Sequence, residues 1–459
     1  MDILRIPVVS TLLQWRWGRL IFQILLLGVA LLIIYDGLTG PQLAPANSAT
    51  VLVWVVFRGF VVLSLLLVGN LFCFSCPFTI IRTLSRKLSL VGGRWPRFLR
   101  NKWVSIVTLL LIFWLYEWLD LWSSPQLTAL LVIAYFGLSF TMEIGFKESP
   151  FCKYVCPLGA FNFVYSTISP TQINDRLRRT CDQCPGKECV NSSTTVPGCG
   201  TELYVPTINS NMDCVLCIDC ARACPYENVA LSSRPLLVEP AERNWRPRWD
   251  MAFLLVGITF FGVLNAFGMV PPIYELQTWL EESASIQSEG LRILIILLVG
   301  GFGLTTLTVL GCSWLGTRGS KITPLKSAGL FAPTFVPMGF GIWFAHYTFH
   351  FIMGGLTILP VMQSFLLDHG IQWLGTDPMW DVGYLMPMDW IFPLQVTVIM
   401  IGFFLSLYAL GRRALQIDGT PLEGLRLMLP WAVILVLLVV ISLSIFNLPM
   451  EMRGTFRVN

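Results

Sequence analysis

The chemistry that this sequence could support is concentrated in its cysteines. Twelve of the 13 cysteines lie in tight clusters between Cys73 and Cys224, and only Cys312 stands apart. Spacings of two to four residues are typical of metal sites rather than of a disulfide framework. The sequence therefore predicts thiolate-bound metal centres.

Residues 214–225 read C-V-L-C-I-D-C-A-R-A-C-P, the C-x2-C-x2-C-x3-C-P run of bacterial [4Fe–4S] ferredoxins. In two-cluster ferredoxins the fourth cysteine of such a run ligates the other cluster. The upstream cysteines form a stretched first motif, C-x2-C-x4-C-x9-C. Crossed ligation then predicts one cluster on Cys181, Cys184, Cys189 and Cys224, and a second on Cys199, Cys214, Cys217 and Cys220. Four thiolates also suit zinc, and the stretched motif leaves open one cluster beside a zinc knuckle or free thiols.

Two further cysteine pairs follow apolar segments, and each ends in proline. They read Cys73-Phe-Ser-Cys76-Pro77 and Cys152-Lys-Tyr-Val-Cys156-Pro157. If both loops lie on the same side of a membrane, their four thiolates complete one site. Soft thiolate ligands select iron–sulfur, Cu(I) or zinc. An iron–sulfur cluster is favoured because a ferredoxin motif is its covalent neighbour, and thiol pairs with a redox or structural role are the alternative.

The composition is that of a membrane protein. Of the 459 residues, 55% are hydrophobic and 13% charged, against about 25% charged in soluble proteins, and the mean hydropathy is +0.68. The net charge of +4 is too small to indicate a nucleic-acid partner. Apolar runs near 20 residues match a bilayer core of about 30 Å. They predict nine spans, at 18–36, 51–71, 103–123, 126–146, 250–270, 292–314, 328–358, 391–410 and 429–447. Pro333 and Pro337 predict a kink or break in the seventh.

Along the chain, connecting loops that contain Lys and Arg alternate with loops that contain neither. Lys and Arg occupy 81–102 (Arg82, Arg86, Lys87, Arg94, Arg97, Arg100 and Lys102), 317–327 and 411–426, whereas 37–50, 122–125, 271–290 and 360–390 have none. The positive-inside rule then predicts a cytoplasmic N-terminus in a bacterial inner membrane. A cleaved signal peptide ending near Ala46 is the alternative, but 46 residues is long for a signal.

The expected fold is all-α and polytopic, with an inserted small α+β two-cluster ferredoxin on the cytoplasmic face. Residues 171–249 contain eight cysteines and no apolar run long enough to span a membrane. The predicted domains are therefore a four-helix membrane domain (1–170), the ferredoxin domain (171–249) and a five-helix membrane domain (250–459).

The order of four spans, two Cys–Cys-Pro pairs and a two-cluster ferredoxin resembles the NapH/NosR-type membrane polyferredoxins of bacterial respiration. The resemblance covers residues 50–235, and its most specific parts are Cys152 to Ala160 and Cys214 to Pro225. It implies electron transfer between the quinone pool or cytoplasmic donors and periplasmic reductases or their maturation. The chain departs from the family in the short spacing of its first pair, its stretched motif and its C-terminal half. A periplasmic flavin domain of NosR type is absent.

The C-terminal half contains the three histidines of the chain. His346 and His350 lie four residues apart in the seventh span, with Met353 on the same helical face, and His369 lies in an outer loop. Histidines inside membranes are candidates for function. Imidazole and thioether ligands suit haem or copper, so a metal site is one reading. A quinone site and simple interhelical hydrogen bonds are the others.

Charged residues also fall within the predicted spans. Arg58 lies in the second span, and Glu117 and Asp120 lie in the third. Because unpaired charge in lipid is costly, Arg58 is expected to pair with one of these carboxylates. A proton path or quinol site is the alternative. Glu143 lies close in sequence to the Cys152 pair and is a candidate proton relay.

Together these features predict a membrane-integral electron-transfer protein with a redox partner and no substrate chemistry of its own. It would be a component of an oxidoreductase system rather than a stand-alone enzyme, and no residue is assigned a catalytic role. The alternative is a copper reductase or maturation factor for a periplasmic or membrane metalloenzyme. A transporter controlled by its iron–sulfur domain is a third reading.

Overall fold

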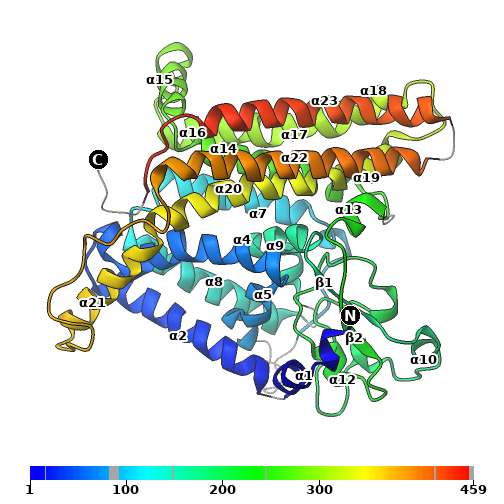
Figure 1. The fold of residues 1–459 in the computed structure, drawn as a ribbon, viewed down its shortest axis with the longest axis horizontal. Helices are drawn as coiled ribbons and strands as arrows, with labels where there is room; N and C mark the ends of the chain where they lie inside the picture. The colour runs from blue at the N-terminus through cyan, green and yellow to red at the C-terminus, as the bar shows by residue number, and fades with distance from the viewer. Residues whose placement is uncertain (16, 82–91, 147–148, 243–244, 418–419, 454–459) are drawn as a thin grey trace. The chain divides into compact units, whose positions relative to one another are not determined.

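The computed structural model describes residues 1–15, 17–81, 92–146, 149–242, 245–417 and 420–453. The described chain is mostly helical (Figure 1). Eight of its helical segments are long and apolar enough to cross a membrane, so the chain is a multi-pass membrane protein. These segments are Gly18–Thr39, Ser48–Leu67, Pro125–Gly145, Trp249–Phe267, Glu289–Thr317, Pro324–Asp368, Met388–Leu415 and Pro421–Phe446.

The third predicted span is shorter than expected. Helix α7 (Trp103–Trp118) has 16 residues, which at about 1.5 Å per residue is shorter than a bilayer core of about 30 Å. Eight of the nine predicted spans therefore meet the length criterion within the described residues. The basic loop before α7 is described in part, and Arg82, Arg86 and Lys87 lie outside the described residues.

The seventh predicted span is broken, as its prolines predict. Helix α19 (Pro324–Phe331) ends in a 3-10 turn (Ala332–Phe335) that contains Pro333, and α20 (Val336–Gly354) then begins. A proline lacks the N–H needed for the helical ladder, so it is tolerated in the first turn of a new helix. A second 3-10 turn separates α20 from α21 (Ile358–Asp368).

The chain divides into two compact units. Unit 1 comprises Met1–Leu31, Leu63–Ser105 and Ile133–Glu239, and unit 2 comprises Leu32–Val62, Ile106–Val132 and Pro240–Asn459. Unit 1 contains every cysteine except Cys312. The three consecutive domains expected from the sequence stay a prediction.

Unit 1 is organised around a two-stranded antiparallel sheet. Strand β1 (Thr171–Asp175) pairs with β2 (Val229–Ser233) in the register Thr171 to Ser233, and Asp2 adds a bridge to Ser232. The 53 residues between the strands hold the short helices α10 (Arg178–Asp182), α11 (Glu188–Asn191) and α12 (Asp219–Ala223). A small core containing Ile173, Ile218 and Leu231 lies beneath them.

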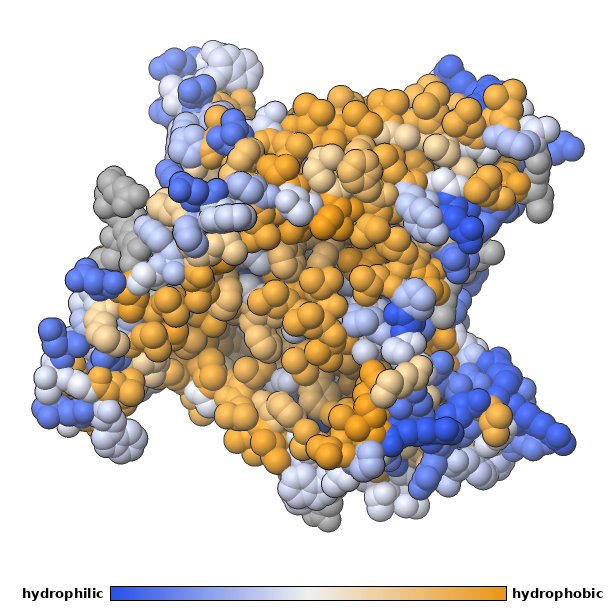
Figure 2. Space-filling model, in the orientation of Figure 1, coloured by the Kyte–Doolittle hydropathy of each residue, from blue (hydrophilic) through white to orange (hydrophobic). Residues whose placement is uncertain are grey.

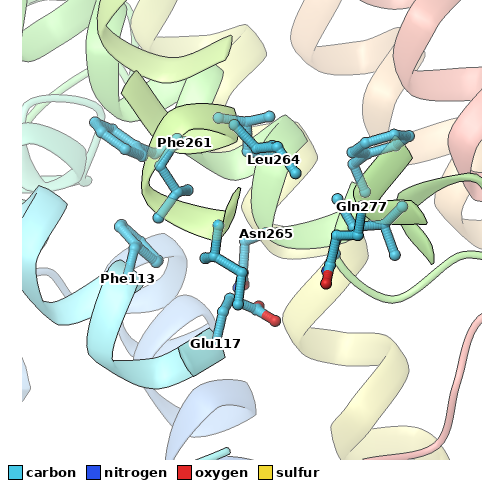
Figure 3. A pocket seen from close by; sticks show the side chains of 12 residues that line it. Phe113, Glu117, Phe261, Leu264, Asn265 and Gln277 are labelled. Carbon is cyan, nitrogen blue, oxygen red and sulfur yellow. The ribbon is translucent and has the colours of Figure 1, made fainter. Parts of the chain in front are cut away.

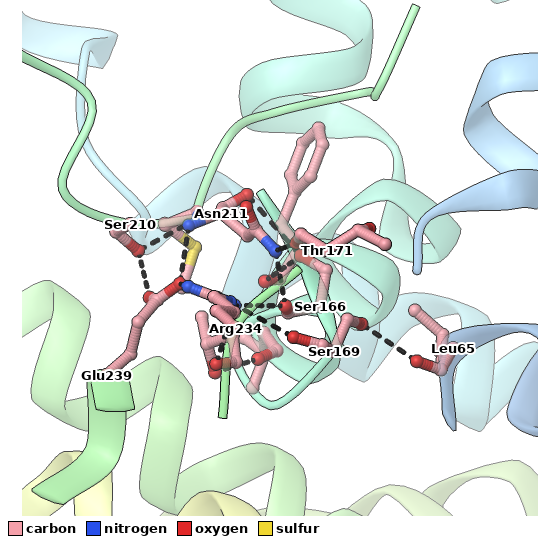
Figure 4. A network of polar contacts seen from close by, with 12 residues as sticks. Leu65, Ser166, Ser169, Thr171, Ser210, Asn211, Arg234 and Glu239 are labelled. Carbon is pink, nitrogen blue, oxygen red and sulfur yellow. Dashed lines mark hydrogen bonds and ion pairs between the residues drawn. The ribbon is translucent and has the colours of Figure 1, made fainter. Parts of the chain in front are cut away.

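A buried ion pair ties β2 to the rest of unit 1. Arg234, just after β2, pairs with the fully buried Glu239 of α13 (Val238–Glu242) and donates to the carbonyls of Ser166, Thr167 and Ser169 (Figure 4). Glu239 also accepts from the backbone N–H of Asn211 at 2.8 Å. Because each charge has several hydrogen-bond partners, the cost of burying the pair is offset. The network positions the loop that leads into Cys214, whose N–H donates to the Asn211 carbonyl at 3.0 Å.

Unit 2 contains a bundle of long helices. Helix α20 packs against α14 (Trp249–Phe267) and α22 (Ile391–Leu415), and α22 packs against α23 (Pro421–Phe446). Glycine permits the close approach of α20 and α22, since a Cβ on Gly402 would lie 2.7 Å from the Pro337 carbonyl oxygen. Exposed apolar side chains such as Phe404 and Val440 cover the outer faces of α22 and α23 (Figure 2).

Candidate metal centres

The twelve clustered cysteines line three cavities, with four cysteines at each. Quartet A is Cys181, Cys184, Cys189 and Cys224; quartet B is Cys199, Cys214, Cys217 and Cys220; quartet M is Cys73, Cys76, Cys152 and Cys156. The volume of each of the three cavities is about 20 Å³. Equal size and an equal number of thiols are consistent with the same kind of group at each site. The structure thus brings together each set of four cysteines that the sequence predicts.

Quartet B is shaped by left-handed backbone in the Cys214 run. Leu216 and Ile218 have positive φ angles of 55° and 62°. Such residues turn the chain sharply after each cysteine, so that backbone N–H groups point back toward sulfur. The backbone N–H groups of Leu216 and Asp219 lie near the sulfurs of Cys214 and Cys217 and favour their charged forms. Donors of this kind stabilise thiolates and raise the potential of a bound cluster.

Quartet A receives its fourth cysteine from the end of α12. Cys220 lies inside α12 and faces quartet B, whereas Cys224 follows the helix and faces quartet A. Asn228 holds quartet A together, because its side-chain amide donates to Cys181 Sγ at 3.1 Å and its backbone N–H donates to Cys224 Sγ at 3.4 Å. The inserted loop 190–198 returns the chain to this region, and the N–H of Cys199 donates to the Cys189 carbonyl at 2.9 Å.

Quartet M is built from two similar Cys-Pro turns. Cys76 and Cys156 have extended backbone, as expected before proline, and each caps the helix that its proline begins. The sulfur of Cys156 accepts from the N–H of Gly159 at 3.2 Å, at the start of α9 (Pro157–Ser166). Cys76 precedes a single 3-10 turn (Pro77–Thr79), and its carbonyl accepts from the N–H of Thr79 at 3.3 Å. The Cys156 sulfur therefore lies at a helix N-terminus, where the helix dipole favours negative charge.

Two clasps connect quartets B and M. Asn70, 2% exposed, donates to the Cys214 carbonyl at 3.0 Å and accepts from the Cys73 N–H at 3.4 Å. The buried Lys102 pairs with Asp213 and donates to the Lys153 carbonyl at 2.8 Å, so it joins the residues beside Cys214 and Cys152. Val215 lines the cavities of both quartets. The two sites are therefore immediate neighbours.

Each quartet supplies four thiols to one small cavity. Within the described residues, no three His, Cys, Asp or Glu side chains are arranged to hold a single ion. A [4Fe–4S] cluster takes four cysteine thiolates, which is the number that each quartet supplies.

Burial favours the protonated form of the four thiols of quartet M and of the Cys214 thiol. It raises the pKa of Cys76 to about 11 and the pKa of Cys156 and Cys214 to about 12, and it raises the pKa of Cys73 and Cys152 well above the usual range. Thiolates are required for metal binding. Metal binding at quartet M would therefore release protons.

The predicted histidine site lies in unit 2, whereas the cysteine quartets lie in unit 1. His346 and His350 are buried in α20, with ring centroids 5.0 Å apart. Both ring nitrogens of His346 lack a hydrogen-bond partner among the described residues. The same is true of Nε2 of His350. His369 differs, because its nitrogens contact the Tyr35 hydroxyl at 2.9 Å and the Phe365 carbonyl at 2.8 Å.

The expected partner of Arg58 is corrected by the structure. Within the described residues, Arg58 forms no ion pair, and its guanidinium faces the rings of Trp54, Tyr116 and Tyr347 at 5.3, 4.9 and 5.2 Å. Glu117 instead accepts from Arg453 Nη1 at 3.0 and 2.9 Å. Cation–π contacts with several aromatic faces replace a carboxylate as the stabilising partner of Arg58.

Several residues that position the sites were missed from the sequence. Asn70, Lys102, Asp213 and Asn228 all contact cysteine loops, but each is a single polar residue without a recurring spacing. Glu143, a predicted relay, is buried beside quartet M and accepts from the Ser149 hydroxyl at 3.3 Å.

About half of this chain is similar to a protein of Escherichia coli. "Putative electron transport protein YccM" of Escherichia coli (strain K12) is 28% identical over 258 residues, which are 49% of this chain and 67% of that protein. No family model and no solved structure matches the chain. The name of the relative and the multi-pass helical structure fit a role in membrane electron transport.

Proposed function

We propose that this protein is a membrane-integral iron–sulfur electron-transfer protein, with a [4Fe–4S] cluster at each of quartets A, B and M. The observation that carries the proposal is the sorting of twelve cysteines into three separate cavities of four. Each cluster, when bound, takes up and releases one electron. The protein supplies the thiolates, the N–H groups aimed at sulfur and the exclusion of water.

The contacts between quartets define an order A–B–M for the electron path. Quartets A and B share the Cys189–Cys199 backbone hydrogen bond, and B and M share Val215 and the Asn70 clasp. Tyr226, 51% exposed, lines the cavity of quartet A. Three of the four cysteines in quartet M are buried. Quartet A is thus the end accessible to a soluble redox partner, and quartet M is the membrane end.

The basic loops support a location in the bacterial inner membrane, with the ferredoxin region in the cytoplasm. Electrons then pass between a cytoplasmic or quinone-linked partner and a membrane or periplasmic partner. Membership of the NapH/NosR-type polyferredoxins is part of this proposal, supported by the two Cys-Pro turns and the Cys214 run. The direction of flow depends on cluster potentials.

The proposal is tested by metal analysis and EPR of the anaerobically purified protein. Three clusters correspond to about twelve iron per chain. Cys217→Ser should remove one reduced-state EPR component while the protein still inserts into the membrane. Unchanged iron and an unchanged EPR spectrum in that variant would refute the cluster assignment. Stoichiometric copper in place of iron would favour the copper reductase or maturation factor, for which the unpartnered His346 and His350 are the best ligands.

A further inference from the structure

An arginine at the start of α2 (Gly18–Thr39) contacts the cysteine loops of both quartet B and quartet M. Arg19 Nε donates to the Phe74 carbonyl at 2.8 Å, and Nη2 donates to the Thr79 hydroxyl at 3.1 Å. Both partners belong to the first Cys-Pro turn of quartet M. The remaining contact is an ion pair of Nη1 with the Asp219 carboxylate at 3.3 Å. Asp219 lies in the Cys214 run of quartet B, so the guanidinium joins the two loops.

The position of Arg19 is unfavourable for α2 itself. It lies in the first turn, where the helix dipole disfavours a positive charge. Gln23, one turn later on the same face, donates from its amide to the Cys76 carbonyl at 3.3 Å and to the Thr79 hydroxyl at 2.7 Å. The contacts with quartet M, rather than the stability of α2, therefore account for a cation at this position.

A second ion pair between the quartets has the same polarity. Asp213 directly precedes Cys214 of quartet B, and it pairs with the buried Lys102. Lys102 also donates at 2.8 Å to the carbonyl of Lys153, inside the second cysteine pair of quartet M. In both ion pairs the carboxylate belongs to the Cys214 run, and the cation is bonded to a carbonyl of quartet M. Each pair is therefore negative toward quartet B and positive toward quartet M.

These charges act on the sulfurs of the quartet that they face. Burial raises the pKa of Cys73 and Cys76 in quartet M, and the positive charge of Arg19 partly opposes this rise. Burial also raises the pKa of Cys217 in quartet B, where the negative charge of Asp219 adds to the rise more than Arg19 opposes it. Gain of an electron adds negative charge, as loss of a proton does. The same field therefore favours reduction at quartet M relative to quartet B, because cluster potentials respond to nearby charge.

We propose that these two ion pairs set the direction of electron transfer, by holding the reduction potential of quartet M above that of quartet B. One electron leaves the centre at quartet B and is gained at quartet M, so the transfer needs no other reactant. Arg19, Lys102, Asp213 and Asp219 are positioning residues, since they act on the two centres through their charges and do not bind them. This direction, from quartet B to quartet M, rests on the proposed function and extends it.

The test is EPR-monitored redox potentiometry of the anaerobically purified full-length protein. The components of quartets B and M are identified by their loss in Cys217→Ser and Cys156→Ala. A unit charge acting over about 10 Å at an effective dielectric constant of about 20 changes an equilibrium constant roughly tenfold. Arg19→Gln should therefore lower the reduction equilibrium constant of quartet M about tenfold, a shift of about 59 mV for a one-electron couple, with a smaller change at quartet B.

The opposite charge gives a shift of opposite sign. Asp219→Asn should raise the reduction equilibrium constant of quartet B about tenfold. Damage to the loops would not lower one potential and raise the other, so the two signs distinguish charge from a disturbed fold. Arg19→Lys keeps the charge and should hold quartet M within about threefold of the native value. Arg292→Gln is the matched control, because Arg292 is a shielded arginine of unit 2 that pairs with Glu281 at 3.0 Å, and it should change neither potential.

Unchanged potentials in both Arg19→Gln and Asp219→Asn would overturn the proposal. Shifts of the same sign in the two variants would also overturn it, as would an Arg19→Lys shift equal to that of Arg19→Gln. If Arg19→Gln fails to assemble, the sign of the Asp219→Asn shift decides alone. The buried Glu143 beside quartet M is present in every variant, so it does not affect the comparison. Absence of iron from the native protein would refute the proposed function, whereas iron with unaltered potentials would refute only the direction of transfer.

Discussion

Quartet M allows the sharpest test of the proposed electron path. Cys156→Ala removes one of four sulfurs and leaves the N–H group of Gly159 without its acceptor. A cluster needs all four thiolates, and each cluster holds four iron atoms. Iron should therefore fall from about twelve to about eight per chain, and one EPR component should disappear. Cys76→Ala should remove the same component, because Cys76 lines the same cavity from the other Cys-Pro turn.

The double variant decides whether the two turns form one site. Cys76→Ala with Cys156→Ala should lose no more iron than either single variant. Cys312→Ala is the matched control, since Cys312 is buried in α18 (Cys312–Thr317) and belongs to no quartet. Additive iron loss with two spectrally distinct components would show that the turns hold separate centres, and the assignment of quartet M would fail.

Three further predictions concern the clasps, the histidines and the orientation. Asn70→Leu removes the N-cap of α5 (Leu71–Ser75) and the donor to the Cys214 carbonyl. It should lower the free energy of unfolding by about 2–3 kcal/mol. It should also slow reduction of the quartet M cluster, as measured by rapid-freeze EPR. Asn162→Leu, which loses only one bond within its own helix, should leave that rate unchanged; equal rates in both variants would refute the clasp. His346→Ala and His350→Ala should block electron delivery to an external or quinone acceptor while the clusters stay reducible, and full turnover in both would exclude a redox role. Reporter fusions after residues 95, 240 and 322 should read cytoplasmic and those after 45, 284 and 372 external, and an external reading at 240 would reverse the orientation.

The spans and the cysteine sets could be predicted because their signals are local. A run of about 20 apolar residues has few alternatives to a membrane helix, and eight of the predicted runs are long apolar helices. In the Cys214 run, two residues separate Cys214 from Cys217 and Cys217 from Cys220, so that one short loop carries three sulfurs. Pro225 ends α12 after Cys224, so that the last cysteine can face the other site.

The tertiary structure alone decided which distant polar groups meet. The partner of Glu117 is Arg453, 336 residues away, and no periodicity relates them. Arg58 contacts the ring of Trp54, four residues before it, and the rings of Tyr116 and Tyr347, which come from distant segments of the chain. Because single polar residues in apolar segments carry no spacing signal, the sequence could place them at a depth in the membrane but could not identify their partners.

The same reason explains the clasps and the unpartnered oxygen of Asn265 (Figure 3). Asn70 and Asn265 are ordinary asparagines in the sequence, and their roles arise from packing: one bridges two cysteine loops, and the other is left with an unpartnered oxygen in an apolar cavity. Ligand types at short spacings are a property of local sequence, so the sequence by itself determined which cysteines lie together in each quartet. The neighbours of those sites and the empty space between helices exist only once the helices have packed.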